Sequence, residues 1–324
     1  MTARGIMDWF AYLLVRAALS LVQAVSMETC HSVARALAYL FYDLLRLRRA
    51  VTDENLQHAL PNQTPRERDL MARRMWEHLL LMVMEIAHAP RKIHETNWRR
   101  YIQMTNKRQL VDLMLQPRPK VIVTAHFGNF EIAGYVAGLL GIRTYTIARS
   151  LDNQYLDQFL NSFRESKGQF ILPKVGSAPQ ADAVLDSGGS LVLLGDQHAG
   201  PKGCWVKFMG RPTSCHKALA LFTLISSAPM ALITCQRVGK PLHFNLALID
   251  VADPLAPRAE LAGVKQLTQW YNDVLEQEIR NSPEQYWWLH RRWRDDEPKS
   301  KRQLAELRAA GEAETPPPLE RSAA

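Results

Sequence analysis

The residues best suited to chemistry lie in the segment Lys120–Gly134, where His126 and Glu131 are five residues apart. A carboxylate bonded to one imidazole nitrogen fixes the tautomer and stabilises the imidazolium, which leaves the other nitrogen to act as a general base. On one continuous helix, residues five apart point about 140° away from each other. The pair can therefore meet only if His126 lies in a turn and Glu131 lies on the first turn of the following helix.

Two common catalytic signatures are absent from the sequence. It has no G-x-S-x-G elbow and no H-E-x-x-H helix, so neither a hydrolase triad of the elbow type nor a metal site has support. A histidine and a carboxylate without a protein nucleophile suit the deprotonation of a substrate hydroxyl for direct attack. Taken alone, an H-x4-E match is more often a turn histidine near a surface glutamate, so its surroundings must decide.

The elements around the pair alternate between strand and helix. Val121–Ala125 is a β-branched apolar run typical of a buried strand, Gly128-Asn129 favours a turn, and Phe130–Leu140 is compatible with a helix. From about Tyr101 this alternation predicts an α/β fold, with a mostly parallel central sheet flanked by helices. The other expected strands are Thr144–Ala148, Leu191–Leu194, Met230–Cys235 and Phe244–Leu248, and the other expected helices are Asn106–Leu115, Asn153–Lys167, Ala178–Ser187 and His216–Ser226.

The N-terminal segment Ile6–Val25 is apolar except for Asp8, Arg16 and a few small polar residues. An arginine near the centre of a spanning helix costs about 2.5–3.5 kcal/mol on insertion scales. An interfacial helix, with Trp9 near the lipid headgroups and Arg16 reaching their phosphates, fits at least as well. We expect a helix that contacts the membrane; a spanning helix and an ordinary buried helix remain alternatives.

Four segments are expected along the chain. Residues 1–30 form the membrane-associated helix, 31–100 a helical layer, 101–296 the α/β core, and 297–324 a polar, disordered tail. Within the helical layer, Thr64-Pro65-Arg66-Glu67 has the pattern of a capping box with proline at the first helical position. This pattern predicts a long helix from Pro65 to about Ala89.

Length, charge and cysteine spacing limit the classes of protein to which this chain can belong, but they do not identify its binding partner. The 324 residues are enough for a sizeable core, and the net charge of +8 favours an anionic partner such as membrane, acidic protein or nucleic acid. The four cysteines have no close paired spacing, so they indicate neither a zinc knuckle nor a disulfide framework, and a reducing compartment is expected. A non-catalytic basic protein that binds membrane or nucleic acid remains an alternative of a different class.

The chain contains an ordered series of motifs: His126-Phe-Gly-Asn-Phe-Glu131, Ala148-Arg-Ser-Leu-Asp-Asn153, Phe163-Arg-Glu165, Gly195-Asp-Gln-His-Ala-Gly-Pro201, Val206-Lys-Phe-Met-Gly210 and Pro283-Glu-Gln-Tyr-Trp-Trp-Leu-His-Arg-Arg-Trp293. Over roughly residues 10–296 this series resembles the bacterial lipid A biosynthesis (lauroyl/myristoyl) acyltransferases. This sequence departs from them at Asp196-Gln-His198, where many members carry a second acidic residue, and the departure leaves the acceptor open.

The resemblance implies an O-acyltransferase that moves a fatty acyl chain from acyl carrier protein to a hydroxyl of a lipid A precursor. It would need no cofactor or metal and would act at the cytoplasmic face of the inner membrane. His126 would be the general base and Glu131 would orient it. Arg164 and Asp196 match positions that the family needs for activity, Arg164 as an anion or oxyanion contact and Asp196 as a group that holds Arg164 or substrate. Weaker candidates are Arg149, for a substrate phosphate, and Gly128, whose turn would supply an oxyanion amide.

The same resemblance leaves the partners partly open. Arg291, Arg292 and Arg294 are expected either to meet acidic acyl carrier protein or lipid phosphate, or to form a solvated face. Another glycolipid, such as a phosphatidylinositol mannoside, is an alternative acceptor for the same chemistry. Nothing in the chain resembles a nucleic-acid-binding module.

Overall fold

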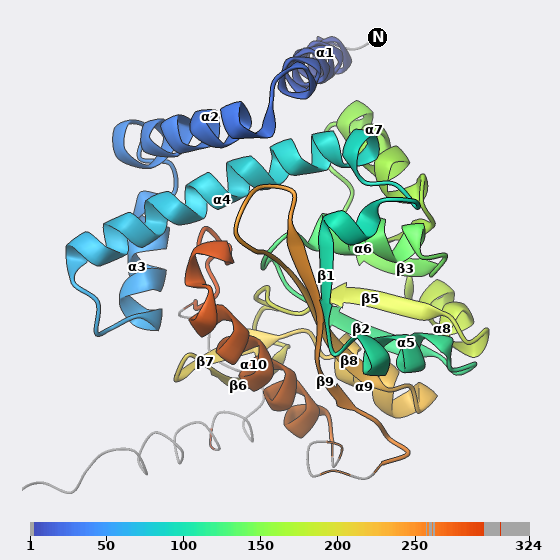
Figure 1. The fold of residues 1–324 in the computed structure, drawn as a ribbon. Coiled ribbons are helices and arrows are strands. Elements are labelled where there is room, and N and C mark those ends of the chain that lie inside the picture. Colours follow the sequence, from blue (N-terminus) through green and yellow to red (C-terminus); the bar gives the residue numbers. More distant parts are fainter. Residues whose placement is uncertain (1–2, 257, 259–260, 262, 295–304, 306–324) are drawn as a thin grey trace, which may run out of the picture.

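The structure is a computed structural model that describes residues 3–256, 258, 261, 263–294 and 305. Apart from residue 305, the predicted tail at 297–324 lies outside the described residues. The N-terminal part is helical, and α4 lies between α2 on its outer side and α6 on its inner side (Figure 1). The helices before the sheet are α1 (Ala3–Ala24), α2 (Met27–Tyr39), the π-helix η1 (Leu40–Leu44), α3 (Arg49–Ala59), α4 (Pro65–Lys92) and the short η2 (Trp98–Arg100).

The start of α4 has the capping box that the sequence predicts. The Thr64 hydroxyl accepts a hydrogen bond from the Glu67 backbone N–H, and the Glu67 carboxylate accepts one from the Thr64 N–H at 2.6 Å. Two amides that have no partner within the helix are thereby satisfied. This helix begins at Pro65 as predicted and ends at Lys92, three residues beyond the predicted end.

The core is a seven-stranded sheet in the order β1-β9-β8-β2-β5-β3-β4. All neighbours are parallel except β8 and β9, so the predicted α/β fold with a mostly parallel sheet is confirmed. The strands are β1 (Ile102–Thr105), β2 (Lys120–Thr124), β3 (Thr144–Ala148), β4 (Gln169–Pro173), β5 (Ser190–Leu194), β8 (Met230–Arg237) and β9 (Phe244–Ala252), and a separate hairpin is formed by β6 (Cys204–Phe208) and β7 (Arg211–Cys215).

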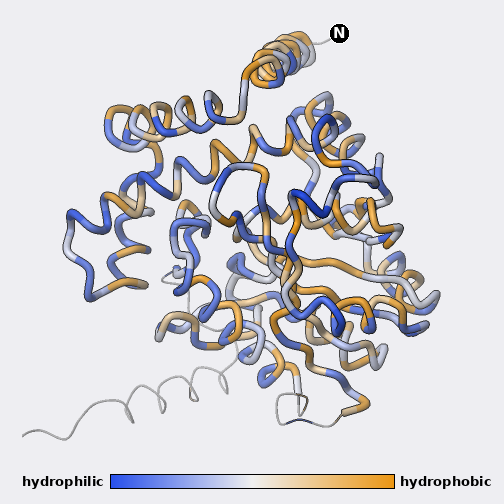
Figure 2. Tube along the Cα trace, in the orientation of Figure 1, coloured by the Kyte–Doolittle hydropathy of each residue, from blue (hydrophilic) through white to orange (hydrophobic). Residues whose placement is uncertain are grey.

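Helices cover the sheet and bury its central strands. Val121, Leu191 and Met230 of three adjacent strands are fully buried, together with Tyr271 of the helix α10. Each such side chain contributes about 1.5–3 kcal/mol through burial, and Figure 2 shows the central strands as largely hydrophobic. The remaining helices are α5 (Lys107–Leu115), α6 (Phe130–Leu139), α7 (Gln154–Glu165), α8 (Ala178–Asp186), α9 (Ala218–Ser226), α10 (Val264–Asn281) and the short η4 (Pro283–Gln285).

Helix α1 is apolar on its outer side, and by length and composition Arg4–Ala24 is sufficient to cross a membrane. Arg16 does not extend away from the protein as expected. Its guanidinium donates to the Tyr12 hydroxyl at 2.8 Å and lies 4.9 Å from the centre of the Phe159 ring on α7. The cation is therefore held against α7. The strongly exposed apolar side chains of α1 are Met7, Phe10, Leu14 and Leu21.

Candidate active site

His126 and Asp196 follow two neighbouring strands of the sheet. β2 and β5 are parallel and in register, with Thr124 opposite Leu194, so the second residue after each strand lies at the same edge. This carboxyl-terminal edge is where open α/β sheets bind ligands. Parallel pairing thus brings together two residues that are 70 positions apart.

Asp196 fixes both the position and the tautomer of His126. Its Oδ1 lies 2.9 Å from His126 Nδ1, and its Oδ2 accepts a hydrogen bond of 3.1 Å from the His126 backbone N–H. The amide nitrogen of Gln197 lies 3.3 Å from His126 Nε2. Because an amide nitrogen donates, Nε2 is the acceptor and the imidazole proton is on Nδ1. The lone pair of Nε2 is therefore the one that a substrate hydroxyl would use, by replacing the long contact with Gln197, as a general base requires.

Asp196 is held in its ionised form although it is only 3% exposed. Burial by itself raises the pKa of Asp196, but the electrostatic attraction and hydrogen bonds of His126, together with the charge of Arg292, bring that pKa below its ordinary value. An ionised carboxylate beside Nδ1 stabilises the imidazolium that forms when Nε2 takes up a proton.

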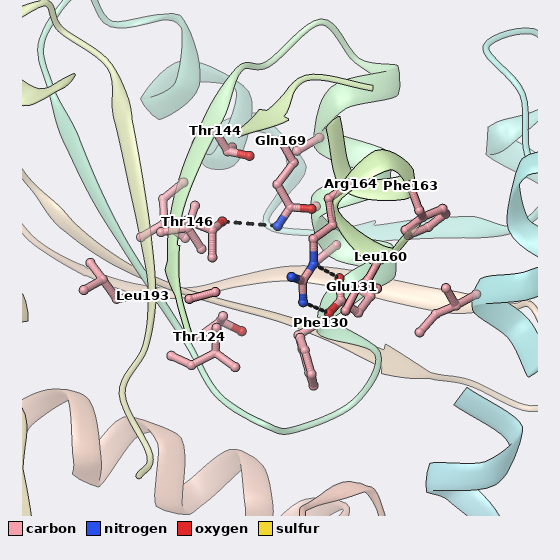
Figure 3. Close-up of a pocket in the computed structure, with 18 of the residues that line it drawn as sticks. Thr124, Phe130, Glu131, Thr144, Thr146, Leu160, Phe163, Arg164, Gln169 and Leu193 are labelled. Carbon is pink, nitrogen blue, oxygen red and sulfur yellow. Dashed lines mark hydrogen bonds and ion pairs between the residues drawn. The ribbon is translucent and has the colours of Figure 1, made fainter. Parts of the chain in front are cut away.

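Glu131 is paired with Arg164 instead of His126. Arg164 Nε donates to Glu131 Oε2 at 2.9 Å, and Nη2 donates to Oε1, which makes the pair bidentate (Figure 3). Among the described residues no hydrogen bond joins Glu131 to His126, so the structure differs from the predicted histidine–glutamate contact. Glu131 is on the first turn of α6 and reaches the last turn of α7, whereas His126 lies before α6 and reaches across to β5.

Aromatic side chains frame His126. The Trp287 ring centre is 4.8 Å from that of His126, and Phe130 meets the imidazole edge-on at 5.3 Å. The Trp287 backbone N–H also donates to the His126 carbonyl at 3.1 Å. The motif at Pro283–Trp293 therefore lies against the turn that carries His126. Trp287 and Gln197 belong to the predicted motifs, but their contacts with His126 were not predicted.

Gly128 serves the fold of this turn. Its φ is +62°, and a Cβ at this position would lie 2.2 Å from the Cys235 carbonyl oxygen of β8. Its N–H donates to the Gln285 carbonyl at 3.0 Å, and the N–H of Asn129 donates to the Cys235 carbonyl at 2.7 Å. The amides of Gly128 and Asn129 are thus already used, so neither is available for the oxyanion contact expected here.

The side chains of His126, Glu131 and Arg164 line a cavity of 1610 Å³. The lining is mostly apolar and extends from α1 and α4 to α9. In Figure 3, Leu160 of α7 lies next to the Glu131–Arg164 pair. Cavities for drug-sized ligands measure about 300–1,000 Å³. This one has room for a larger ligand with a long apolar part.

The predicted arginines divide into exposed and buried ones. Arg149 lines the cavity, is 75% exposed and pairs with Asp152 at 2.9 Å. Arg291 and Arg294 are exposed, as a partner contact requires. Arg292 is 1% exposed and donates to Asn272 Oδ1 at 2.9 Å and to Cys215 Sγ at 3.0 Å. Its expected contact with a partner is therefore excluded, because the side chain is enclosed by the fold.

The family model described as bacterial lipid A biosynthesis acyltransferase matches residues 3–295. The chain belongs to this family. It is therefore an acyltransferase, as the motif series predicts. The chain is 23% identical to the lipid A biosynthesis palmitoleoyltransferase of Escherichia coli (strain K12) over 255 residues, which cover 77% of this chain and 80% of that protein. It is 24% identical over 256 residues, with the same coverage, to the lipid A biosynthesis lauroyltransferase of that organism.

A more distant likeness is to the crystal structure of the 1-acyl-sn-glycerophosphate acyltransferase from Thermotoga maritima. The TM-score is 0.38 and the sequence identity is 11%, with 78% of this chain and 97% of that chain covered. A likeness of this size bears on neither the fold nor the function of the present chain.

Proposed function

We propose that the protein transfers a fatty acyl chain from acyl carrier protein to a hydroxyl of a lipid A precursor, with His126 as the general base. One observation carries the proposal: the imidazole of His126 has its Nδ1 proton against an ionised carboxylate, and its Nε2, which accepts only a long contact from Gln197, lies in the lining of a large, mostly apolar cavity. The family membership supports the acceptor class.

In the proposed reaction, His126 Nε2 removes the proton from the acceptor hydroxyl while the oxygen attacks the thioester carbonyl carbon. The new C–O bond gives a tetrahedral intermediate with an oxyanion. Its collapse breaks the C–S bond, and the imidazolium returns the proton to the departing thiolate. Asp196 stabilises the imidazolium between these two transfers. The proposed reaction requires no cofactor.

Arg164 of the Glu131–Arg164 pair lines the same cavity as this base. Arg164 uses Nε and Nη2 on Glu131 and Nη1 on Asn161 at 3.3 Å, and a guanidinium has five N–H donors. These contacts use three of the five N–H donors of Arg164, so two donors remain for a substrate oxygen. We assign Arg164 to the oxyanion or to a phosphate oxygen of the acceptor. Glu131 then orients Arg164, a different task from the predicted one. Arg149, at the exposed part of the cavity lining, is proposed as a phosphate contact.

Helix α1 is proposed to hold the protein at the cytoplasmic face of the inner membrane. Its outward side chains are apolar while Arg16 faces α7, which suits contact with lipid. The triple variant Phe10→Gln, Leu14→Gln, Leu21→Gln should move the protein from the membrane fraction to the soluble fraction. Retention on membranes would show that another surface holds it. These exposed positions are preferred to deletion of α1, because α1 also lines the cavity.

The direct test uses purified protein, acyl-acyl carrier protein and candidate acceptors, with product lipids measured by mass spectrometry. Transfer to a lipid A precursor is expected, and His126→Ala should reduce kcat by about 10²–10⁴-fold. His94→Ala, an exposed histidine near the end of α4, is the matched control. Full activity in His126→Ala would overturn the general-base role. Transfer only to a phosphatidylinositol mannoside would overturn the acceptor class, and salt-sensitive polynucleotide binding without transfer would overturn the activity.

A further inference from the structure

A second polar cluster lies behind the turn at Gly128-Asn129, away from the cavity. It consists of His78 and Glu85 on α4 and Arg237 at the end of β8. Arg237 donates from Nε and Nη2 to the two Glu85 oxygens at 2.6 and 2.7 Å, and from Nη1 to His78 Nδ1 at 2.8 Å. None of the three lines the cavity.

The tautomer of His78 follows from its partners. A guanidinium only donates, so His78 Nδ1 accepts from Arg237 and the imidazole proton is on Nε2. Nε2 therefore donates to the Gly128 carbonyl, 3.2 Å away. Burial, followed by the charge of Arg237, lowers the pKa of His78 well below its ordinary value. A neutral His78 thus holds the backbone of the turn through one hydrogen bond.

Glu85 holds the next residue of the turn. It is fully buried, and besides Arg237 it accepts a hydrogen bond from the Leu242 N–H at 2.9 Å and one from Asn129 Nδ2 at 3.2 Å. The other end of the Asn129 amide, Oδ1, accepts from the Ile132 N–H and caps α6. By taking Nδ2, Glu85 keeps Oδ1 directed at the helix that carries Glu131.

Arg237 links the cluster to the C-terminal motif. Its backbone N–H donates to Gln285 Oε1 at 2.9 Å, and Gln285 Nε2 donates back to the Arg237 carbonyl at 3.0 Å. The Gln285 carbonyl in turn accepts from the Gly128 N–H. Three distant segments, α4, β8 and η4, therefore converge on Gly128 and Asn129, two of the four residues between His126 and Glu131.

We propose that His78, Glu85 and Arg237 are positioning residues for acyl transfer, which fix the turn and thereby the placement of His126 and Glu131. The inference rests on the proposed function. Burying charge is a poor way to stabilise a fold, because well-packed apolar residues do as well or better. Misplacement of reacting groups by about 1 Å can cost 10²-fold in rate. A buried ionic cluster aimed at this turn is therefore better explained by the geometry it fixes.

The first test compares two substitutions of the same residue. In His78→Gln, the amide nitrogen can occupy the place of Nε2 and keep the bond to Gly128. In His78→Asn, the shorter amide can accept from Arg237 but does not reach Gly128. We expect a fall in kcat of about 10–100-fold in His78→Asn, as for other supporting contacts, at nearly unchanged KM and Tm. His78→Gln should stay within about threefold of the unchanged protein.

The second test removes both buried charges in the double variant Glu85→Leu, Arg237→Met. A buried pair replaced as a pair usually leaves stability unchanged or higher, but the Leu242 N–H and Asn129 Nδ2 also lose their acceptor. Tm should therefore fall somewhat, and kcat, measured well below that Tm, should fall as well. An unchanged kcat in this variant would overturn the positioning role. Unchanged kcat in His78→Asn, or equal losses in His78→Asn and His78→Gln, would overturn the positioning role. If the unchanged protein transfers no acyl group in the same assay, the proposed function itself is wrong, so the two failures are distinguishable.

Discussion

Two histidines flank the turn between β2 and α6, and they differ in what is left to a substrate. His126, on the cavity side, donates from Nδ1 to an ionised carboxylate and has only a long amide contact at Nε2. His78, on the far side, accepts at Nδ1 from Arg237 and donates from Nε2 to a backbone carbonyl. The tautomers are opposite, and only His126 has a lone pair that a substrate can reach.

The difference shows how the neighbours of a histidine decide its task. A carboxylate beside Nδ1 favours the protonated imidazole that general-base catalysis produces. A guanidinium at the same nitrogen disfavours it, and burial adds to the effect, so the pKa of His78 is well below the ordinary value. The cavity side of the turn is thus suited to proton transfer and the far side to holding position. The following predictions test this division, beginning with the largest effect.

Gly128→Ala should disturb both sides at once. A non-glycine residue at positive φ costs about 1–2 kcal/mol, and a Cβ 2.2 Å from the Cys235 carbonyl oxygen must also displace β8. We expect Tm to fall by about 5–15 °C, on a scale of roughly 2–4 °C per kcal/mol, and transfer activity to be lost. Gly239→Ala is the matched control, because its φ is +69° and nothing lies within 4 Å of its Cβ position. Equal losses of Tm in the two variants would contradict the crowding at Gly128.

Asp196→Asn should affect the cavity side alone. An amide can donate to His126 Nδ1, which moves the imidazole proton to Nε2 and blocks the base, so kcat should fall by about 10²–10⁴-fold. The double variant with His126→Ala should be no slower than His126→Ala alone, because residues that act as a unit are not additive. The control is Asp253→Asn, whose partner Arg118 contacts both of its carboxylate oxygens at 2.8 Å. Asp253→Asn should lower Tm without lowering kcat. An unchanged kcat in Asp196→Asn would contradict the proposed role of Asp196.

Arg164→Lys should lower activity by a smaller factor. Lysine keeps the charge but loses the planar, bidentate contact with Glu131, so we expect a decrease in kcat of about 10–100-fold. Arg118→Lys makes the same change in another bidentate pair, that of Arg118 with Asp253. Steady-state kinetics of both variants separate a role at the site from a general effect of losing such a pair. Equal kinetics in the two variants would remove Arg164 from the proposed mechanism.

The smallest predicted effect is on stability in acid. The folded-state pKa of Asp196 lies below its unfolded value, near 3.9 for aspartate. Its contribution to stability is therefore present above about pH 4 and is lost as the pH falls through the folded-state pKa. Acid unfolding followed by circular dichroism should show a shallower decrease for Asp196→Asn than for the unchanged protein. If both proteins lose stability equally as the pH falls, protonation of Asp196 does not contribute to the pH dependence of stability.

The sequence was sufficient to predict the strands of the sheet that are apolar and buried. Thr144–Ala148 was predicted to the residue, and the strand after Lys120 to within one residue at each end. β1 and β4 were not predicted because they are short strands at the edges of the sheet, and each of them buries only one side chain. Whether an edge segment forms a strand depends on its pairing with the neighbouring strand, and the local sequence pattern contains little information about this pairing.

The candidate site was predicted in its members but not in its pairing. Spacing showed that His126 must precede the helix that carries Glu131, and this is what the structure has. Which carboxylate reaches the imidazole depends on the register of β2 and β5, and this register is set by long-range packing. The His78–Glu85–Arg237 cluster had one available signal: His78 and Glu85 are seven residues apart, so they lie on the same face of a helix that is otherwise apolar there.

The hydrogen bonds that join Gln285 and Trp287 to the turn around His126 have a consequence for synthesis of the chain. These two residues are translated after every strand of the sheet, whereas α1 is translated before all of these strands. A nascent chain therefore exposes its apolar N-terminal helix outside the ribosome long before the turn around His126 has its full set of contacts. If α1 binds the membrane as proposed, this binding precedes completion of the site, so the order of the elements along the chain limits acyl transfer to protein that has already had the chance to reach a membrane.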